Sequence, residues 1–304
     1  DALVISLMAL GIKSGDEIIT TSNTAIPTIS AIVTAGAKPV YVDINEKNYL
    51  INEHLIERNI SKKTKAIIVV HLYGQSPDMQ KILNVCRKYR IKIIEDCAQS
   101  FGAKYKGKKL GSFGYISAFS FYPTKILGTF GDGGLISTND KKIYEKCKML
   151  RFYGIKKGYV SKFHGINSRL DEIHASILNY KLERIDSSIS KRRKIANFYN
   201  KNLKNKKIEL PEVSSNNHHV FYNYVIRTNK RNILKKYLLQ NGVETKIIYP
   251  YPVHKMKYYS RFKIGRPNLK ITEQVYKQIL SLPIYPEINS RELKKIVNLI
   301  NSFR

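Results

Sequence analysis

Two side chains in the middle of the chain have the residue types and the placement that chemistry on an amino group requires. Asp96 follows Ile93-Ile94-Glu95 at the end of a predicted apolar strand, and Lys125 follows the segment Phe119–Thr124. A lysine amine can form a Schiff base with a carbonyl compound, and a carboxylate can hold a proton on a ring nitrogen. If both segments are strands of one open α/β sheet, both side chains lie at the carboxyl edge, where ligands bind.

Each of these features also has an ordinary structural explanation. An aspartate after a strand often caps the next helix, and a single lysine in such a basic chain is usually a surface residue. The glycines that follow Lys125, at 128, 131, 133 and 134, could form a hairpin by themselves, or they could let the backbone approach a ligand. Taken together, an amine, an acid and a set of small residues suit pyridoxal phosphate.

Short apolar runs alternate with amphipathic stretches around these residues. This alternation predicts an α/β fold with a mostly parallel central sheet and flanking helices. The run 66–70 is entirely apolar and the run 91–94 has one polar residue, Lys92; both are too continuous for a sheet with one wet face, which indicates strands buried on both faces. The predicted strands are 17–20, 39–43, 66–70, 92–95, 117–121 and 135–138, and the predicted helices are 26–35, 76–89 and 141–150.

The second half of the chain has a different pattern. A helix is predicted from Ser168, which would serve as its N-cap, with Leu170, Ile173, Ile177 and Leu178 on one face. A polar loop at 201–207 precedes a predicted strand at 220–227 and a helix at 231–241. We therefore divide the chain into a large domain, residues 1–185, and a smaller C-terminal α+β domain, residues 186–304.

Several motifs occur in an order that resembles one enzyme family. They are Glu95-Asp-Cys-Ala-Gln99, the segment from Ser120 to Gly134, and the segment from Gly165 to Leu178, with Thr24–Thr28, His71–Gly74 and Tyr249–Pro252 as further matches. This series resembles the DegT/DnrJ/EryC1/StrS family of nucleotide-sugar aminotransferases, which are fold-type-I pyridoxal-phosphate enzymes. The likeness extends from Asp1 to the C-terminus.

The resemblance implies a role for each matching position. Lys125 would bind pyridoxal 5'-phosphate as a Schiff base and then carry a proton, while Asp96 would pair with the pyridinium nitrogen. Gln99 would lie against the cofactor ring, and Ser120 would donate to the phosphate. Asn167 would reach the phosphate of the neighbouring subunit, so that a homodimer with shared active sites is expected.

Four further residues are candidate substrate contacts. His71 follows a predicted strand, and His254 lies in a predicted loop; for both, a structural role competes with substrate contact. Tyr122 and Tyr249 could stack or hydrogen-bond in the cleft. The resemblance also implies a Gly-Thr turn immediately before Asp1 that would cradle the phosphate, and we expect a chain without that turn to bind the cofactor weakly or not at all.

Composition limits the remaining possibilities. The formal net charge of +30 favours anionic partners, but the basic residues are spread along the whole chain, which indicates a solvated surface. No nucleic-acid-binding motif and no apolar run of about 20 residues occurs, so neither nucleic acid nor a membrane is an expected partner. Three cysteines without CxxC spacing indicate no metal site and a reducing, cytoplasmic setting.

The expected reaction is transfer of an amino group, with glutamate as donor, to a keto-deoxysugar linked to dTDP or UDP. The sugar would be a 3-keto or 4-keto 6-deoxyhexose for a surface polysaccharide such as O-antigen. The dehydratase branch of the family is an alternative, but it has histidine where this chain has Lys125. A basic anion-binding protein or a catalytically impaired, regulatory relative is the alternative outside enzymes.

Overall fold

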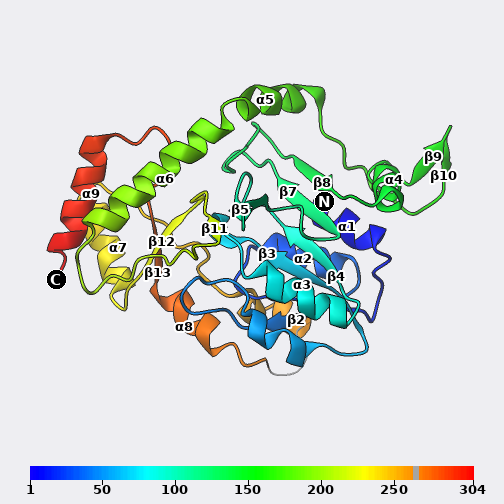
Figure 1. The fold of residues 1–304 in the computed structure, drawn as a ribbon, viewed down its shortest axis with the longest axis horizontal. Helices are drawn as coiled ribbons and strands as arrows, with labels where there is room; N and C mark the ends of the chain where they lie inside the picture. The colour runs from blue at the N-terminus through cyan, green and yellow to red at the C-terminus, as the bar shows by residue number, and fades with distance from the viewer. Residues whose placement is uncertain (263–266) are drawn as a thin grey trace.

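A computed structural model describes residues 1–262 and 267–304 of the chain. Its centre is a sheet with the strand order β2-β1-β3-β4-β7-β8 (Figure 1). Neighbouring strands are parallel except for the edge strand β8, which is antiparallel to β7. These strands are β1 (Glu17–Thr21), β2 (Lys38–Val42), β3 (Thr64–Val70), β4 (Lys92–Asp96), β7 (Ile116–Ser120) and β8 (Gly134–Ser137). The mostly parallel sheet that the sequence predicts is confirmed.

Helices cover both faces of this sheet because successive strand residues point to opposite sides. In β3, Ile68 belongs to a core that α1, α2 and α4 complete, whereas Ile67 belongs to a core on the other face that includes α3. Both isoleucines are completely buried, as the uninterrupted apolar run predicts. These helices are α1 (Ala2–Ala9), α2 (Ile26–Thr34), α3 (Met79–Lys88) and α4 (Lys141–Leu150).

A long helix leads from the sheet to the C-terminal part of the chain. In Figure 1, α6 (Ile185–Asn202) runs diagonally from α5 (Glu172–Leu182) toward α9 (Ser290–Ser302). Its second half, including Tyr199, belongs to a third core around the antiparallel pair β12 and β13. The other elements of this part are α7 (Arg231–Gln240), α8 (Lys270–Gln278), β12 (Tyr224–Arg227) and β13 (Ile279–Leu282).

Short elements complete the described chain. A hairpin of β9 (Ile155–Lys157) and β10 (Val160–Ser161) projects from the body beyond α4 (Figure 1). A small sheet joins β5 (Lys104–Tyr105), β6 (Lys108–Lys109) and β11 (Asn217–His218). The 3-10 helices are η1 (Glu53–Leu55), η2 (Glu57–Asn59), η3 (Leu72–Gly74), η4 (Val253–Lys255) and η5 (Tyr259–Phe262).

Residues from the C-terminal part also contribute to the core of the sheet. Val253, Leu269 and Val275 are buried in the same cluster as α1 and α2. The chain thus crosses from the sheet to the third core and returns before its end. The division at residue 185, where α6 begins, stays a prediction.

Three local predictions are wrong in their boundaries. The helix predicted from Ser168 begins at Glu172, with Asp171 as an N-cap that makes no side-chain capping bond. The strand predicted at 220–227 begins only at Tyr224, because Phe221 has a left-handed φ of 49° that a strand cannot contain. The loop predicted at 201–207 begins after Asn202, since α6 continues to that residue.

Candidate active site

Asp96 is a buried carboxylate at the carboxyl end of β4. Its exposed fraction is 5%. Oδ2 accepts a hydrogen bond of 2.8 Å from the Thr28 hydroxyl on α2, and Oδ1 accepts one of 3.2 Å from the backbone N–H of Ala98. Because carboxylate oxygens have about four lone-pair sites in all, these two bonds leave room for a further donor. The arrangement holds the carboxylate in place without neutralising it.

Lys125 lies on the next strand connection along the sheet. β7 pairs with β4 so that Ala118 is opposite Asp96, and the chain then turns away after Ser120. The turn is tight: the Lys125 N–H donates to the carbonyl of Tyr122 over 2.8 Å. A Cβ on Gly128 would lie 2.7 Å from the carbonyl oxygens of Tyr122 and Pro123, so only glycine fits there. Close packing against the backbone therefore explains why position 128 is a glycine.

Two tyrosines lie near Lys125 and Asp96. The Lys125 Nζ lies 5.0 Å from the centre of the Tyr222 ring, and the Tyr222 hydroxyl is 3.2 Å from Thr124 Oγ1. Burial raises the pKa of the Tyr249 phenol, and the neighbouring Tyr222 and Asp96 raise this pKa further. Tyr249 thus lies within electrostatic reach of both Tyr222 and Asp96. The amine therefore lies beside Tyr222 and the acid near Tyr249, and these two phenols influence each other.

Gln99 is held at both ends of its amide. Oε1 accepts a 2.8 Å hydrogen bond from the backbone N–H of Tyr73, and Nε2 donates over 2.7 Å to the Tyr249 hydroxyl. The side chain is 4% exposed. The amide is thus fixed beside Tyr249, and its predicted contact with the cofactor ring stays a prediction.

The remaining cofactor candidates lie nearer the surface. Ser120 ends β7 opposite Gly134 and is half-buried, and its oxygen accepts a long, 3.4 Å hydrogen bond from the Tyr122 N–H. Tyr122 is half exposed, and Asn167 is exposed beside Phe152, with which it forms an isolated bridge. An exposed Asn167 is available to a second subunit. Its predicted phosphate contact stays a prediction.

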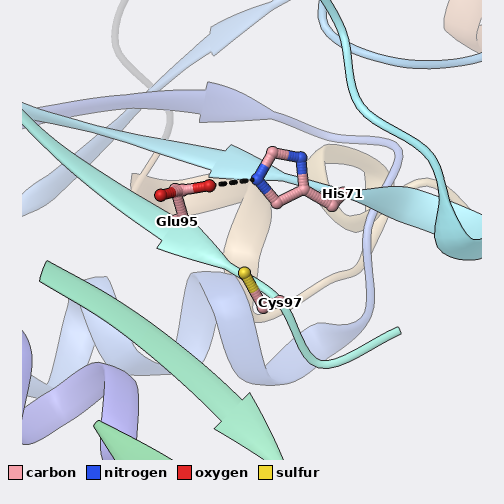
Figure 2. Close-up of side chains that lie close together, drawn as sticks. All are labelled: His71, Glu95 and Cys97. Atoms are coloured by element: carbon pink, nitrogen blue, oxygen red, sulfur yellow. Dashed lines mark hydrogen bonds and ion pairs between the residues drawn. The ribbon is translucent and has the colours of Figure 1, made fainter. Parts of the chain in front are cut away.

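His71 makes a buried pair rather than an open contact. Figure 2 shows its ring pointing at Glu95, with Nε2 2.9 Å from the carboxylate and the Cys97 thiol nearby. His71, Glu95 and Cys97 place their potential ligand atoms within 4.8 Å of one another, a spacing that could suit a metal ion. However, both oxygens of Glu95 already accept hydrogen bonds, from the backbone N–H groups of residues 111, 113 and 114. The carboxylate is fully engaged, so the geometry favours a structural role.

The hydrogen bonds of Glu95 also change its protonation. Although burial raises the pKa of this carboxyl, the bond from His71 and the backbone N–H groups lower it more, and the net pKa is below the usual range. The ionised carboxylate ties the turn at 111–114 to the sheet.

His254 also has partners on both ring nitrogens. Nδ1 is 2.7 Å from the Ser22 hydroxyl, and Nε2 is 3.1 Å from the Glu273 carboxylate. Ser22 is completely buried and His254 is 5% exposed, so this row of groups joins the C-terminal part to the end of β1. The predicted substrate contacts of His71 and His254 stay predictions, and the structural alternative explains both geometries.

Sequence reasoning missed three residues that the structure brings to this site. Thr28, Tyr73 and Tyr222 contact Asp96, Gln99 and Lys125, respectively. Thr28 belongs to a motif that the sequence analysis singled out, and so does Tyr73. No local motif in the sequence indicated that Tyr222 lies near Lys125, because the two residues are almost 100 positions apart.

Comparison with known proteins decides the family. The sequence profile described as the DegT/DnrJ/EryC1/StrS aminotransferase family matches residues 1–301. The chain belongs to this family. Because the match covers nearly every residue of the chain, the resemblance that the motifs suggest is confirmed.

Several curated relatives carry the names of sugar transaminases, and one carries the name of a regulatory protein. The chain is 44% identical to a dTDP-3-amino-3,6-dideoxy-alpha-D-galactopyranose transaminase of Aneurinibacillus thermoaerophilus, over 100% of this chain and 83% of the relative. It is 38% identical to a UDP-N-acetyl-3-dehydro-alpha-D-glucosamine 3-aminotransferase of Acidithiobacillus ferrooxidans, over 99% and 81%. A Geobacillus stearothermophilus relative named pleiotropic regulatory protein is 40% identical, over 100% and 82%.

Solved structures agree with this assignment. DesV of S. venezuelae, determined with a ketimine intermediate, superposes with a TM-score of 0.95 at 35% identity and covers 99% of this chain and 81% of its own. A Bacillus subtilis protein determined with the cofactor PMP has a TM-score of 0.90 at 32% identity, with coverages of 98% and 70%. The fold-type-I prediction and the pyridoxal-phosphate prediction are confirmed. Within the described residues, no helix has both the length and the apolar content that crossing a membrane requires.

Proposed function

We propose that this protein is a pyridoxal-phosphate-dependent aminotransferase that moves an amino group, with glutamate as donor, to a keto-deoxysugar linked to dTDP or UDP. The product would be an amino sugar for a surface polysaccharide such as O-antigen, made in the cytoplasm. The observation that carries the proposal is the placement of Lys125 and Asp96 after neighbouring parallel strands of the sheet, with Lys125 beside Tyr222 and Asp96 within electrostatic reach of Tyr249.

The chemistry of these side chains fits the cofactor. Asp96 is buried, fixed by two hydrogen bonds, and still has lone pairs for an N–H donor. Among the described residues, Lys125 has no carboxylate partner that would immobilise its amine. When bound, pyridoxal phosphate supplies a ring that accepts the electron pair left behind when a proton leaves the donor's α-carbon.

The residues of this chain would divide the remaining work. Asp96 would keep a proton on the ring nitrogen, because a nearby carboxylate raises the pKa of that nitrogen. Lys125 would hold the cofactor through its amine. It would then carry the proton between the donor's α-carbon and the cofactor carbon that takes up this proton. Ser120, together with Asn167 of a second subunit, would bind the phosphate. Tyr122 and Tyr249 would contact the sugar.

The relatives favour amination at carbon 3. Two relatives, 44% and 38% identical to this chain, have names that specify a 3-amino or a 3-dehydro sugar. One of these names contains dTDP and the other UDP, so the proposed substrate class includes sugars linked to either nucleotide. A 3-keto sugar is accordingly the first substrate to test.

An exposed apolar face supports the homodimer. Ile173, Ile177 and Tyr180 follow one side of α5 at the spacing of successive helical turns. With Phe130 they form the α5 face, on which Phe130 is 76% and Ile173 68% exposed. Large apolar side chains grouped on a surface mark an interaction site, and Asn167 lies shortly before this helix. A second copy of the chain is the occupant that we propose.

Borohydride trapping tests the role of Lys125. We expect pyridoxal phosphate added to the protein to be fixed to Lys125 on reduction, as peptide mass spectrometry would show, and expect no label at this site in Lys125→Ala. A matched control is Lys146→Ala, because Lys146 is likewise a lysine with its Nζ near an aromatic ring, 5.6 Å from Phe163. Trapping works even when binding is weak. Labelling of surface lysines alone would contradict the proposal.

The substrate is tested by product analysis. We expect a dTDP-linked 3-keto-6-deoxyhexose and glutamate to give a dTDP-linked amino sugar and 2-oxoglutarate, both measurable by mass spectrometry. Loss of a hydroxyl group from the sugar without nitrogen transfer would indicate the dehydratase reaction instead. Trapping at Lys125 without any turnover would favour the regulatory alternative, which the name of the Geobacillus relative motivates.

A further inference from the structure

Three hydrogen bonds connect the end of β3 with the C-terminal segment near residue 249. The Tyr73 N–H donates to Gln99 Oε1 over 2.8 Å, and Gln99 Nε2 donates to the Tyr249 hydroxyl over 2.7 Å. The Tyr73 hydroxyl donates over 2.8 Å to the carbonyl of Ile248, the residue before Tyr249. We call Tyr73, Gln99, Ile248 and Tyr249 the hydrogen-bond circuit. It returns to the residue where it begins, so each member restrains the others.

The backbone at Tyr73 is held in an uncommon conformation. Its φ of 60° and ψ of −1° lie in the left-handed region, which costs a bulky residue free energy and persists only where the surroundings impose it. The surroundings here are tight. Tyr73 is 2% exposed, its ring packs edge-on against Tyr49, and a Cβ on the next residue, Gly74, would lie 2.7 Å from Val220. In this conformation the Tyr73 N–H reaches Gln99, while the Tyr73 phenol reaches the carbonyl of Ile248.

The circuit joins the C-terminal segment to the sheet through buried groups. The contact between His254 and Ser22 does so as well, a few residues further along the chain. Tyr249, a member of the circuit, lies within electrostatic reach of Asp96. A shift of the peptide that joins residues 248 and 249 would move the Tyr249 phenol away from Gln99. Tyr73 therefore controls where this phenol lies.

We propose that Tyr73 is a positioning residue for the sugar half of the reaction: it acts through Tyr249 and does not itself contact the sugar. This inference rests on the proposed function, in which Tyr249 contacts the sugar. Removing only the Tyr73 hydroxyl leaves the N–H bond to Gln99 in place. The cofactor side of the site should then stay intact while Tyr249 loosens.

Tyr73→Phe tests this division. One lost hydrogen bond is worth about 1–1.5 kcal/mol, so we expect KM for the keto sugar to rise about tenfold. The single-turnover rate with glutamate, followed by the change in cofactor absorbance, should change less than about twofold. The matched control is Tyr199→Phe, since the Tyr199 hydroxyl is equally buried and donates to the Pro283 carbonyl over 2.8 Å, outside the site. This control should alter stability but neither kinetic quantity.

A double-mutant cycle separates positioning from a general structural effect. If Tyr73 acts through Tyr249, Tyr73→Phe should raise KM no further in a Tyr249→Phe background. Additive effects of the two substitutions would overturn the inference, and so would an unchanged KM in Tyr73→Phe.

Hydrogen exchange provides a measurement that is independent of cofactor and activity. In the cofactor-free protein, we expect the backbone amides of residues 246–249 and 251 to exchange about tenfold faster in Tyr73→Phe than in the wild type, with no change in Tyr199→Phe. Equal exchange in all three proteins would show that the circuit does not hold the segment. Absence of transamination by the wild type, with this difference in exchange present, would instead count against the proposed function alone.

Discussion

At the scale of single residues, the histidine His219 shows how the fold changes an ordinary side chain. Its ring is 1% exposed and stacks on Phe221 with a centroid distance of 4.0 Å, and Nδ1 accepts a 2.8 Å hydrogen bond from the Phe221 N–H. Burial, together with the smaller effect of the Arg193 charge, lowers the pKa of His219 to about 3. This neutral ring supports the turn that directs Tyr222 toward Lys125.

The lowered pKa predicts a dependence of stability on pH. A histidine in the unfolded chain has a pKa of about 6.5. Between about pH 6.5 and 3, the unfolded state therefore binds a proton at this histidine, whereas the folded state does not. The stability that neutral His219 contributes is therefore complete above this window and is lost as pH falls through it. The maximum slope is about 1.4 kcal/mol per pH unit.

Urea unfolding of His219→Asn at pH 7, 6 and 5 measures this effect. We expect the variant to be less stable than the wild type at pH 7, and expect this difference to shrink by about 1 kcal/mol between pH 6 and 5. The exposed His164 provides the control, because His164→Asn should show no such change. A difference that stays constant with pH would contradict the assignment.

At the scale of secondary-structure elements, one helix is capped by a residue from a distant strand end. Leu269, the N-cap of α8, makes no side-chain capping bond. Instead, the buried Asp43, just after β2, accepts hydrogen bonds from the N–H groups of Ile271 and Thr272 over 2.9 and 2.8 Å. A negative charge at a helix N-terminus is favourable, so Asp43 fixes α8 against the sheet.

Replacement of Asp43 should loosen α8. We expect Asp43→Ala to lower the free energy of unfolding by about 2 kcal/mol, since it removes charge-assisted bonds to several donors at once. Hydrogen exchange should rise in α8 rather than in α7. In the comparison variant Asp140→Ala, which removes an ordinary local cap from α4, exchange should rise only near α4. An increase in hydrogen exchange spread evenly over the molecule in Asp43→Ala would show that the effect of Asp43 is not confined to α8.

At the scale of the whole molecule, the α5 face remains exposed in a single chain. Among the residues on α5, only Leu178 is buried, while Ile173 and Tyr180 are more than half exposed. A Lys181 ammonium lies 4.8 Å from the centre of the Phe130 ring beside them. A second subunit would cover these side chains and would bring its own Asn167 to the cofactor site of the first subunit.

A charge on this face should separate the subunits. We expect Ile173→Asp to convert a dimer into a monomer in analytical ultracentrifugation, and to weaken cofactor retention by at least tenfold because the partner's phosphate contact is lost. The control is Ile233→Asp, since Ile233 is a similarly exposed isoleucine on α7, 61% against 68% exposed. A wild-type protein that sediments as a monomer, or an Ile173→Asp variant that stays dimeric, would refute the proposed interface.

Much of the fold could be predicted from local patterns in the sequence. The apolar run 66–70 of β3 predicted a strand buried on both faces, because such a run has no polar side that could face water. The same patterns predicted Asp96 and Lys125 at one edge of the sheet, since parallel strands end together. The family motifs added pyridoxal phosphate, and the comparisons with known proteins confirm that assignment.

Only the tertiary structure decided which distant residues complete the site. Tyr222 reaches Lys125, and Asp43 caps α8, through contacts that span about 97 and 228 positions of the chain, respectively. The start of β12 was misplaced for a related reason: the left-handed Phe221 is imposed by packing against His219 and the turn at Gly74. Sequence periodicity reports on neighbours along one element, whereas these contacts depend on how separate elements pack, which no local pattern contains.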